Sequence, residues 1–201
     1  MKIVILGPDG VGKSSVVREL LDRLNQGNNI VKMRYLKPQI VFARRGEPVT
    51  INPDPHGKPC RSTLTSIAKI VVWLMEEWYA HLLWDRRDAL LICDRYYHDL
   101  LVDPVRYRYG GPMWMAKIIG ILMPQPELWV LLDAPVEVLQ ARKQEVSWSE
   151  SSRQRQAYKD FVARQRVHII ADSSQTLNRV VLEVERAITV ILRRNAYLEN
   201  L

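Results

Sequence analysis

Short apolar runs alternate with longer amphipathic stretches along this chain. Three runs, K-I-V-I-L, A-L-L-I-C and L-W-V-L-L, are almost entirely apolar, as expected for strands that are buried on both faces of a parallel sheet. The pattern predicts five β-strands, at residues 2–6, 30–36, 89–93, 128–132 and 168–171.

The segments between these strands have helical spacing. The clearest helix begins at Thr63 and carries apolar residues on adjoining faces as far as Leu83. Other helices are predicted at residues 14–24, 135–145, 156–167 and 176–195, and the second of these has Pro135 in its first turn. Strands that alternate with helices imply an α/β fold, a mostly parallel sheet with helices on both faces.

Two segments do not fit this alternation. Residues 38–62 contain five prolines (38, 48, 53, 55 and 59) and few periodic apolar positions, which indicates a long loop. Residues 147–155 are polar and separate the two helices on either side of them. The chain of 201 residues is expected to form a single domain, residues 1–201.

Composition narrows the class of protein. Apolar residues make up 47% of the chain and charged residues 25%, close to the averages of globular proteins, which excludes disorder and collagen. Cys60 and Cys93 are far apart, no signal peptide is apparent, and the apolar stretch at 113–123 contains Lys117 and is too short to cross a bilayer. We therefore expect a cytoplasmic protein with no membrane partner. The net charge of +7 favours anionic ligands. The chain has no run of five or more basic residues, so a nucleic-acid-binding arm is not expected.

The most specific motif lies directly after the first predicted strand. Its sequence, G-P-D-G-V-G-K-S at residues 7–14, fits the phosphate-binding pattern G-x-x-x-x-G-K-[ST] between a strand and a helix. In such a loop glycines let backbone N–H groups point at phosphate oxygens, Lys13 reaches the β- and γ-phosphates, and the Ser14 hydroxyl ligates Mg²⁺. The predicted ATP-binding residues are Gly7, Gly10, Val11, Gly12, Lys13, Ser14 and Ser15.

The remaining motifs separate the classes of phosphate-loop protein. Beyond the phosphate loop itself, no predicted strand leads directly into the D-x-x-G element of GTPases, and no N-K-x-D element is present. Asp94-Arg95-Tyr96 follows a strand, and L-D-A-P-V-E at residues 132–137 is followed by Arg142. With the loop at residues 7–15, an arginine-bearing segment and a terminal strand and helix, the chain resembles the thymidylate kinase family of nucleoside monophosphate kinases.

This resemblance implies a three-layer P-loop NTPase fold with a five-stranded sheet and a helical lid at residues 142–156. It also implies transfer of the ATP γ-phosphoryl group to a nucleoside monophosphate, by default dTMP, with Mg²⁺ as cofactor. Asp94 would help to hold the magnesium ion, and Arg95 would contact the acceptor phosphate and the transferring group. The alternative for Asp94 is a structural role at the strand end.

The family also needs an arginine that closes on ATP. Because the loop has Gly10-Val11 at the relevant place, the lid must supply it, and Arg142 and Arg153 are the first candidates, ahead of Lys143 and Arg155. These four residues could equally form a solvated helix face. Two roles remain open for Asp133: a structural cap at the strand end, or a second group in the metal shell.

The acceptor side departs from the family. An arginine is expected early in the long helix, but only Lys69 is present there, and the segment after Asp94-Arg95-Tyr96 is also different. Candidate acceptor-binding residues are Asp9, Arg95, His98, Arg106 and Arg108, with Asp99 and Tyr107 nearby in sequence. Asp9 would contact a sugar hydroxyl by resemblance or brace its own loop, and residues 106–112 could simply form a surface turn.

Three functions remain open from the sequence. The first is a nucleotide kinase, the second a kinase of another small acceptor such as a nucleoside or sugar, and the third a nucleotide-binding regulatory module without transfer activity. The family often forms dimers, and residues 113–123 could take part in a homodimer.

Overall fold

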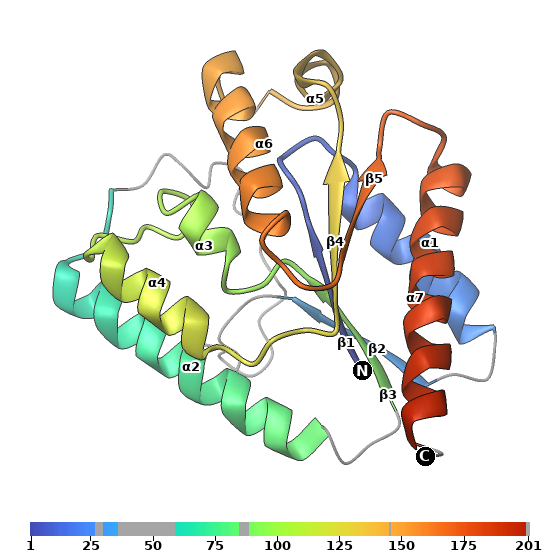
Figure 1. Cartoon of the computed structure of the whole chain (residues 1–201). Coiled ribbons are helices and arrows are strands. Elements are labelled where there is room, and N and C mark those ends of the chain that lie inside the picture. Colours follow the sequence, from blue (N-terminus) through green and yellow to red (C-terminus); the bar gives the residue numbers. More distant parts are fainter. Residues whose placement is uncertain (27–29, 36–58, 85–88, 145, 200–201) are drawn as a thin grey trace, which may run out of the picture. The chain divides into compact units, whose positions relative to one another are not determined.

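The computed structural model describes residues 1–26, 30–35, 59–84, 89–144 and 146–199 (Figure 1). Its five strands all run parallel in one sheet, in the order β2-β3-β1-β4-β5. They are β1 (Lys2–Leu6), β2 (Ile30–Tyr35), β3 (Ala89–Asp94), β4 (Leu128–Asp133) and β5 (His168–Asp172). The predicted α/β class, the parallel sheet and the places of its five strands are confirmed.

The chain divides into two compact units, and the single domain expected over residues 1–201 stays a prediction. The sheet unit comprises Met1–Tyr35, Asp88–Tyr96 and Pro126–Leu201, and the helical unit comprises Leu36–Arg87 and Tyr97–Gln125. The sheet unit carries the helices α1 (Lys13–Asn25), α5 (Val136–Arg142), α6 (Trp148–Val162) and α7 (Leu177–Glu199). The helical unit carries α2 (Thr63–Trp84), α3 (Asp99–Val102) and α4 (Met113–Leu122).

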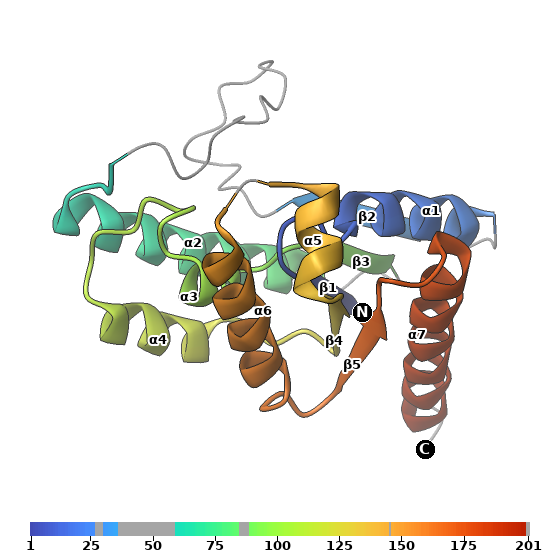
Figure 2. The same ribbon diagram turned by 90° about the horizontal axis from the view of Figure 1, so that it is seen from above.

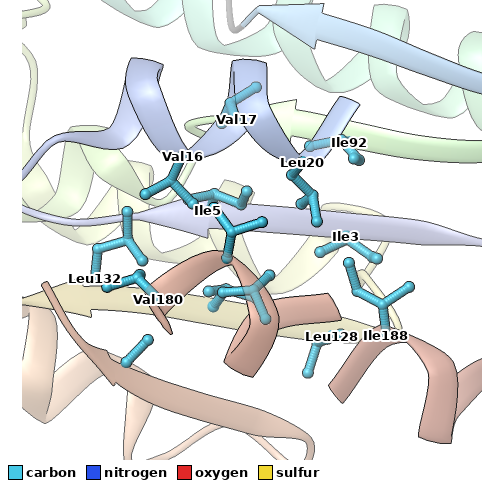
Figure 3. Packing of buried hydrophobic residues seen from close by; sticks show 14 of the residues in the cluster. Ile3, Ile5, Val16, Val17, Leu20, Ile92, Leu128, Leu132, Val180 and Ile188 are labelled. Carbon is cyan, nitrogen blue, oxygen red and sulfur yellow. The ribbon is translucent and has the colours of Figure 1, made fainter. Parts of the chain in front are cut away.

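One face of the sheet packs against α1 and α7. Ile3 and Ile5 of β1 point to this face, as the two-residue repeat of a strand requires, and are fully buried. In Figure 3 they lie beside Val16 and Leu20, which are spaced one helical turn apart on α1, and beside Ile188 of α7. This apolar contact fixes α1 on the sheet and thereby fixes the loop that precedes it.

The opposite face of the sheet is covered by α6. Trp129 points to this side from β4, and its ring lies 5.1 Å from the ring of Phe161 and 5.9 Å from that of Tyr96, both edge to face. Figure 2 shows α6 and α7 on opposite sides of β4 and β5. Because both faces of the sheet are covered, every residue of β4 from Leu128 to Leu132 is apolar and buried, whichever face its side chain points to.

The helix expected to begin near residue 156 begins earlier. The prediction of a polar separator at residues 147–155 is wrong, because Ser147 caps α6 by accepting a hydrogen bond from the Glu150 backbone N–H, 3.3 Å away. This serine and glutamate form the S-x-x-E pattern of a helix start.

Two short helices, α3 and α4, were not predicted, and the loop expected at residues 38–62 lies mostly outside the described residues. Among the residues that the structure describes, none of the helices combines the length and apolarity needed to cross a membrane.

Candidate functional site

The candidate site lies where three neighbouring strands end. β1 is flanked by β3 and β4, and all three run in the same direction, so the segments that follow them emerge at the same edge of the sheet. In the register of the sheet, Ile5 lies opposite Asp94, directly before the loop that follows β1. The sequence motifs at residues 7–14 and 94–96 are therefore neighbours in the sheet unit.

The loop between β1 and α1 has the backbone that its glycines predict. Gly10 and Gly12 have φ angles of 79° and 91°, a left-handed region that residues with a side chain rarely adopt. A Cβ atom at Gly10 would lie 2.6 Å from the carbonyl oxygen of Leu139, whereas one at Gly12 would meet nothing closer than Ser173 Oγ at 3.8 Å. Glycine is therefore required at position 10 for two reasons: the left-handed turn and the close packing of the loop against α5.

Lys13 folds back over this loop. Its ammonium group donates hydrogen bonds to the carbonyl oxygens of Gly7 and Pro8, at 2.6 and 2.8 Å, and the residue is 8% exposed. Gly12 caps α1 without a side-chain hydrogen bond. Among the described residues, the backbone N–H groups of Gly10, Gly12 and Ser14 have no hydrogen-bond partner. A buried ammonium and several unused N–H donors at a helix start make this loop suited to an anion with several oxygens.

Asp9 and Arg95 are brought together by the fold. Arg95 Nη2 lies 2.8 Å from Asp9 Oδ1, and both side chains are largely buried. Arg95 Nη1 lies 3.5 Å from the hydroxyl oxygen of Tyr158 on α6. Arg95 has a φ of 68°, an unfavourable region for an arginine by about 1–2 kcal/mol, and its N–H donates to the Ile5 carbonyl at 3.0 Å. The loop, the end of β3 and α6 therefore meet at this guanidinium group.

The two residues predicted to hold magnesium differ in exposure. Asp94 is 9% exposed at the end of β3, and Ser14 is exposed in the first turn of α1. A hydroxyl and a carboxylate are oxygen ligands of the kind that Mg²⁺ prefers, together with phosphate and water oxygens. Among the described residues, no group of three or more His, Cys, Asp or Glu side chains could hold a metal ion.

The two arginines predicted to act in a lid occupy different surroundings. Arg142 ends α5 and donates to the Ser173 carbonyl at 3.0 Å, while the Ser173 hydroxyl donates to the carbonyl of Val11 in the glycine loop. Arg153 is exposed on α6 and pairs with Glu150 through two contacts of 2.6 and 2.7 Å. The structure therefore links Arg142 to the loop through Ser173.

Asp133 holds α6 to the end of β4. Its two oxygens accept hydrogen bonds from Arg155 at 2.6 and 2.8 Å, and Lys159 lies 3.0 Å away. Burial by itself would raise the pKa of Asp133, but these hydrogen bonds outweigh it and keep the pKa below its usual value. A doubly paired carboxylate of this kind supports the structural role for Asp133 that the sequence left open.

The helical unit contains the other predicted acceptor residues. His98 is 6% exposed, and its Nε2 lies 3.0 Å from the Gly120 carbonyl oxygen. Burial lowers the pKa of His98 to about 4, so the ring is neutral at pH 7 and Nε2 donates this hydrogen bond. Arg106 pairs with the buried Asp103 at 3.4 Å, and Asp99 accepts a 2.6 Å hydrogen bond from the Tyr107 hydroxyl. Acceptor binding by His98 and Arg106 stays a prediction, since both already have structural partners.

Arg108 differs from Arg106. Its φ is 53°, and its Nε donates to the Pro59 carbonyl at 2.9 Å. Beyond it, Gly110 donates its N–H to Ser66 Oγ at 2.9 Å, and the Tyr109 hydroxyl donates to the Pro112 carbonyl at 3.0 Å. Ser66 thus holds the segment after Arg108 to α2, and acceptor binding by Arg108 stays a prediction.

Comparison with known proteins adds no family to this site. The chain matches no protein-family model, and it has no significant match among curated proteins. The chemistry of the site is therefore argued from the side chains and backbone described above.

Two residues of this site were not found from the sequence. Ser173 follows β5 and bridges Arg142 to the loop, and Tyr158 lies in the middle of α6 beside Arg95. Neither residue belongs to a recognisable sequence motif. Their contacts depend on the positions of β5 and α6 in the fold. For Tyr158 a signal was available: it lies eight residues after Glu150 in a helix whose start the serine cap marks.

Proposed function

We propose that the protein is an ATP-dependent phosphotransferase with a P-loop NTPase fold and a helical lid at residues 142–156. The observation that carries this proposal is the glycine loop between β1 and α1. It combines left-handed Gly10 and Gly12, unused backbone donors and the buried ammonium of Lys13 at one helix start. These features match the needs of a triphosphate tail, which requires many N–H donors and a point charge.

Each residue of the sheet-unit site has a place in this proposal. The loop N–H groups and Lys13 bind the phosphates, and Lys13 exchanges its carbonyl partners for phosphate oxygens. Ser14 and Asp94 would hold Mg²⁺, which neutralises charge on the phosphate oxygens when bound. Arg95, oriented by Asp9, directs positive charge toward the transferring group, where charge stabilisation contributes most to the rate.

The acceptor is proposed by resemblance to be a nucleoside monophosphate, with dTMP as the default. The different residues on the acceptor side support the alternative of another small acceptor. An acceptor screen with ATP and Mg²⁺ separates these functions. Rapid turnover with dTMP selects the first, turnover only with another compound selects the second, and ATP binding without transfer selects a regulatory module.

The loop itself is tested by Lys13→Ala. Loss of a hydrogen bond to a charged group weakens binding by about 1.5–3 kcal/mol, so we expect ATP affinity to fall roughly 10- to 100-fold in calorimetric titrations. Arg18→Ala is the matched control, because Arg18 is an exposed cation on the same helix. ATP binding that is equal in the wild type and Lys13→Ala, or absent from the wild type, would overturn the proposal.

A further inference from the structure

Three basic side chains of the helical unit come together around the start of α2. Arg61 lies just before α2, Lys69 lies two turns into it, and Arg108 follows α3 in the chain. The Arg61 N–H donates to the Arg108 carbonyl at 2.9 Å, and Lys69 Nζ donates to the carbonyl of Tyr107 at 3.1 Å. Through these two bonds, the backbone at residues 107 and 108 contacts both Arg61 and Lys69.

These cations lack the acidic partners that other arginines of the protein have. Among the described residues, Arg61, Lys69 and Arg108 form no ion pair, while Arg106, two positions from Arg108, pairs with Asp103. The carboxylate of Asp99 accepts from the Tyr107 hydroxyl. The carboxylates described along this segment are therefore engaged elsewhere, and the cluster has an excess of positive charge.

Lys69 is the most affected member of the cluster. Burial, followed by the charges of Arg61 and Arg108, lowers its pKa to about 8. The ammonium lies 4.6 Å from the ring centre of Trp73 and 5.7 Å from that of Tyr107, which partly offsets the repulsion. Arg108 also holds an unfavourable left-handed backbone with a φ of 53°. The repulsion among these like charges is a cost that binding of an anion would offset.

We propose that Arg61, Lys69 and Arg108 form a site for the phosphate group of a phosphomonoester. Two guanidinium groups supply planar pairs of donors and the ammonium supplies a point charge, a combination suited to a doubly charged tetrahedral anion. That the phosphomonoester is the acceptor of the reaction rests on the proposed function. The phosphate site itself does not. A neutral nucleoside or sugar would leave the three charges without a counter-ion, so the acceptor class is narrowed to compounds that already carry a phosphate.

The direct test measures acetylation of individual lysines at pH 8 by mass spectrometry, with and without inorganic phosphate. The reagent attacks the neutral amine, and an anion at the site keeps Lys69 protonated and covered. We expect saturating phosphate to slow acetylation of Lys69 about tenfold. Lys117, an exposed lysine of α4, is the internal control and should not change. An unchanged rate at Lys69, or equal slowing at both lysines, would overturn the site.

Phosphate binding is then measured in a Lys13→Ala background, which weakens binding at the glycine loop. We expect Arg108→Ala in this background to weaken phosphate binding at least tenfold and Lys117→Ala to leave it unchanged. A second variant, Arg61→Gln, tests the cluster without altering a left-handed residue. If both arginine variants bind phosphate as tightly as the Lys13→Ala background and circular dichroism shows them folded, the proposal is overturned.

The source of the phosphate is resolved by a panel of nucleoside monophosphates, sugar monophosphates and their unphosphorylated forms. Protection of Lys69 by phosphorylated compounds alone is expected, and equal protection by neutral forms would overturn the assignment. The two proposals can fail separately. If phosphate protects Lys69 but ATP does not bind, the proposed kinase function is wrong and the phosphate site stands. If ATP binds through Lys13 but phosphate leaves Lys69 unprotected, only this inference is wrong.

Discussion

Gly10 and Gly12 allow a matched measurement of how tightly the glycine loop packs. Both have positive φ, so alanine at either position meets the left-handed penalty of about 1–2 kcal/mol. Alanine also restricts the unfolded chain, which returns about 0.4–1 kcal/mol. We therefore expect Gly12→Ala, whose Cβ has open space, to lower the free energy of unfolding by about 1 kcal/mol or less.

Gly10→Ala has an additional steric cost. Its Cβ would lie 2.6 Å from the Leu139 carbonyl oxygen and 3.4 Å from Lys143 Cβ, so α5 or the loop must move. Overpacking of this kind costs about 1–3 kcal/mol. Taking about 2 kcal/mol as the difference between the two variants, Tm should be about 4–8 °C lower for Gly10→Ala than for Gly12→Ala.

Thermal unfolding followed by calorimetry and circular dichroism measures this difference. Equal Tm values for the two variants would show that α5 does not press on the loop at Gly10. A lower Tm for Gly12→Ala than for Gly10→Ala would refute the reasoning more strongly, since it would reverse the order that the Cβ positions dictate. ATP titration of the same variants shows whether a displaced α5 also weakens binding.

Three further predictions concern the lid, a buried ion pair and the pH dependence of stability. Arg142→Ala should lower turnover on the order of 100-fold with little change in ATP affinity, and Arg153→Ala should lower it less; unchanged turnover in both would remove the lid from the mechanism. Asp133→Asn should lower the free energy of unfolding by about 1–2 kcal/mol at pH 7. Because the folded pKa of Asp133 is depressed, this loss should vanish as the pH falls below about 4, and urea titrations across that range check it. His98 has a folded pKa of about 4 and an unfolded pKa of about 6.5, so the unfolded chain binds more protons and stability should fall as the pH drops from 6.5 to 4. His98→Gln should flatten that fall, and an identical pH profile in the variant would contradict the neutral, buried ring.

Apolar pattern predicted the sheet well because its strands are covered on both faces. The runs that became β1, β3 and β4 are only five or six residues long and end at glycine or aspartate, and this short length favours a buried strand over a buried helix. The start of α6 was missed because its first two turns are polar, and only the cap at Ser147 marks it. Helix α4 was missed because Met113–Leu122 is apolar nearly all round and has no clear periodicity.

The site was predictable only where all the residues that form it lie in one short segment of the chain. The loop around Lys13 and its joining of a strand to a helix are local, so the sequence alone predicted the residues and their places. The pairing of Asp9 with Arg95 joins residues 86 positions apart, and the meeting of Arg61, Lys69 and Arg108 depends on how one loop returns to α2. Contacts of this kind follow from tertiary packing, which no spacing rule along the chain contains.

The contacts of Lys13 with the carbonyls of Gly7 and Pro8 bear on which anions the loop selects. An ammonium already coordinated by two protein oxygens gains nothing from chloride or another small monovalent ion that offers a single contact. Only a ligand that supplies several oxygens at once, and engages the neighbouring amides together with the lysine, displaces those carbonyls at a net gain. Under the proposed function, the loop would therefore discriminate by the number of oxygens that a ligand presents, and monovalent salt would compete for it only weakly.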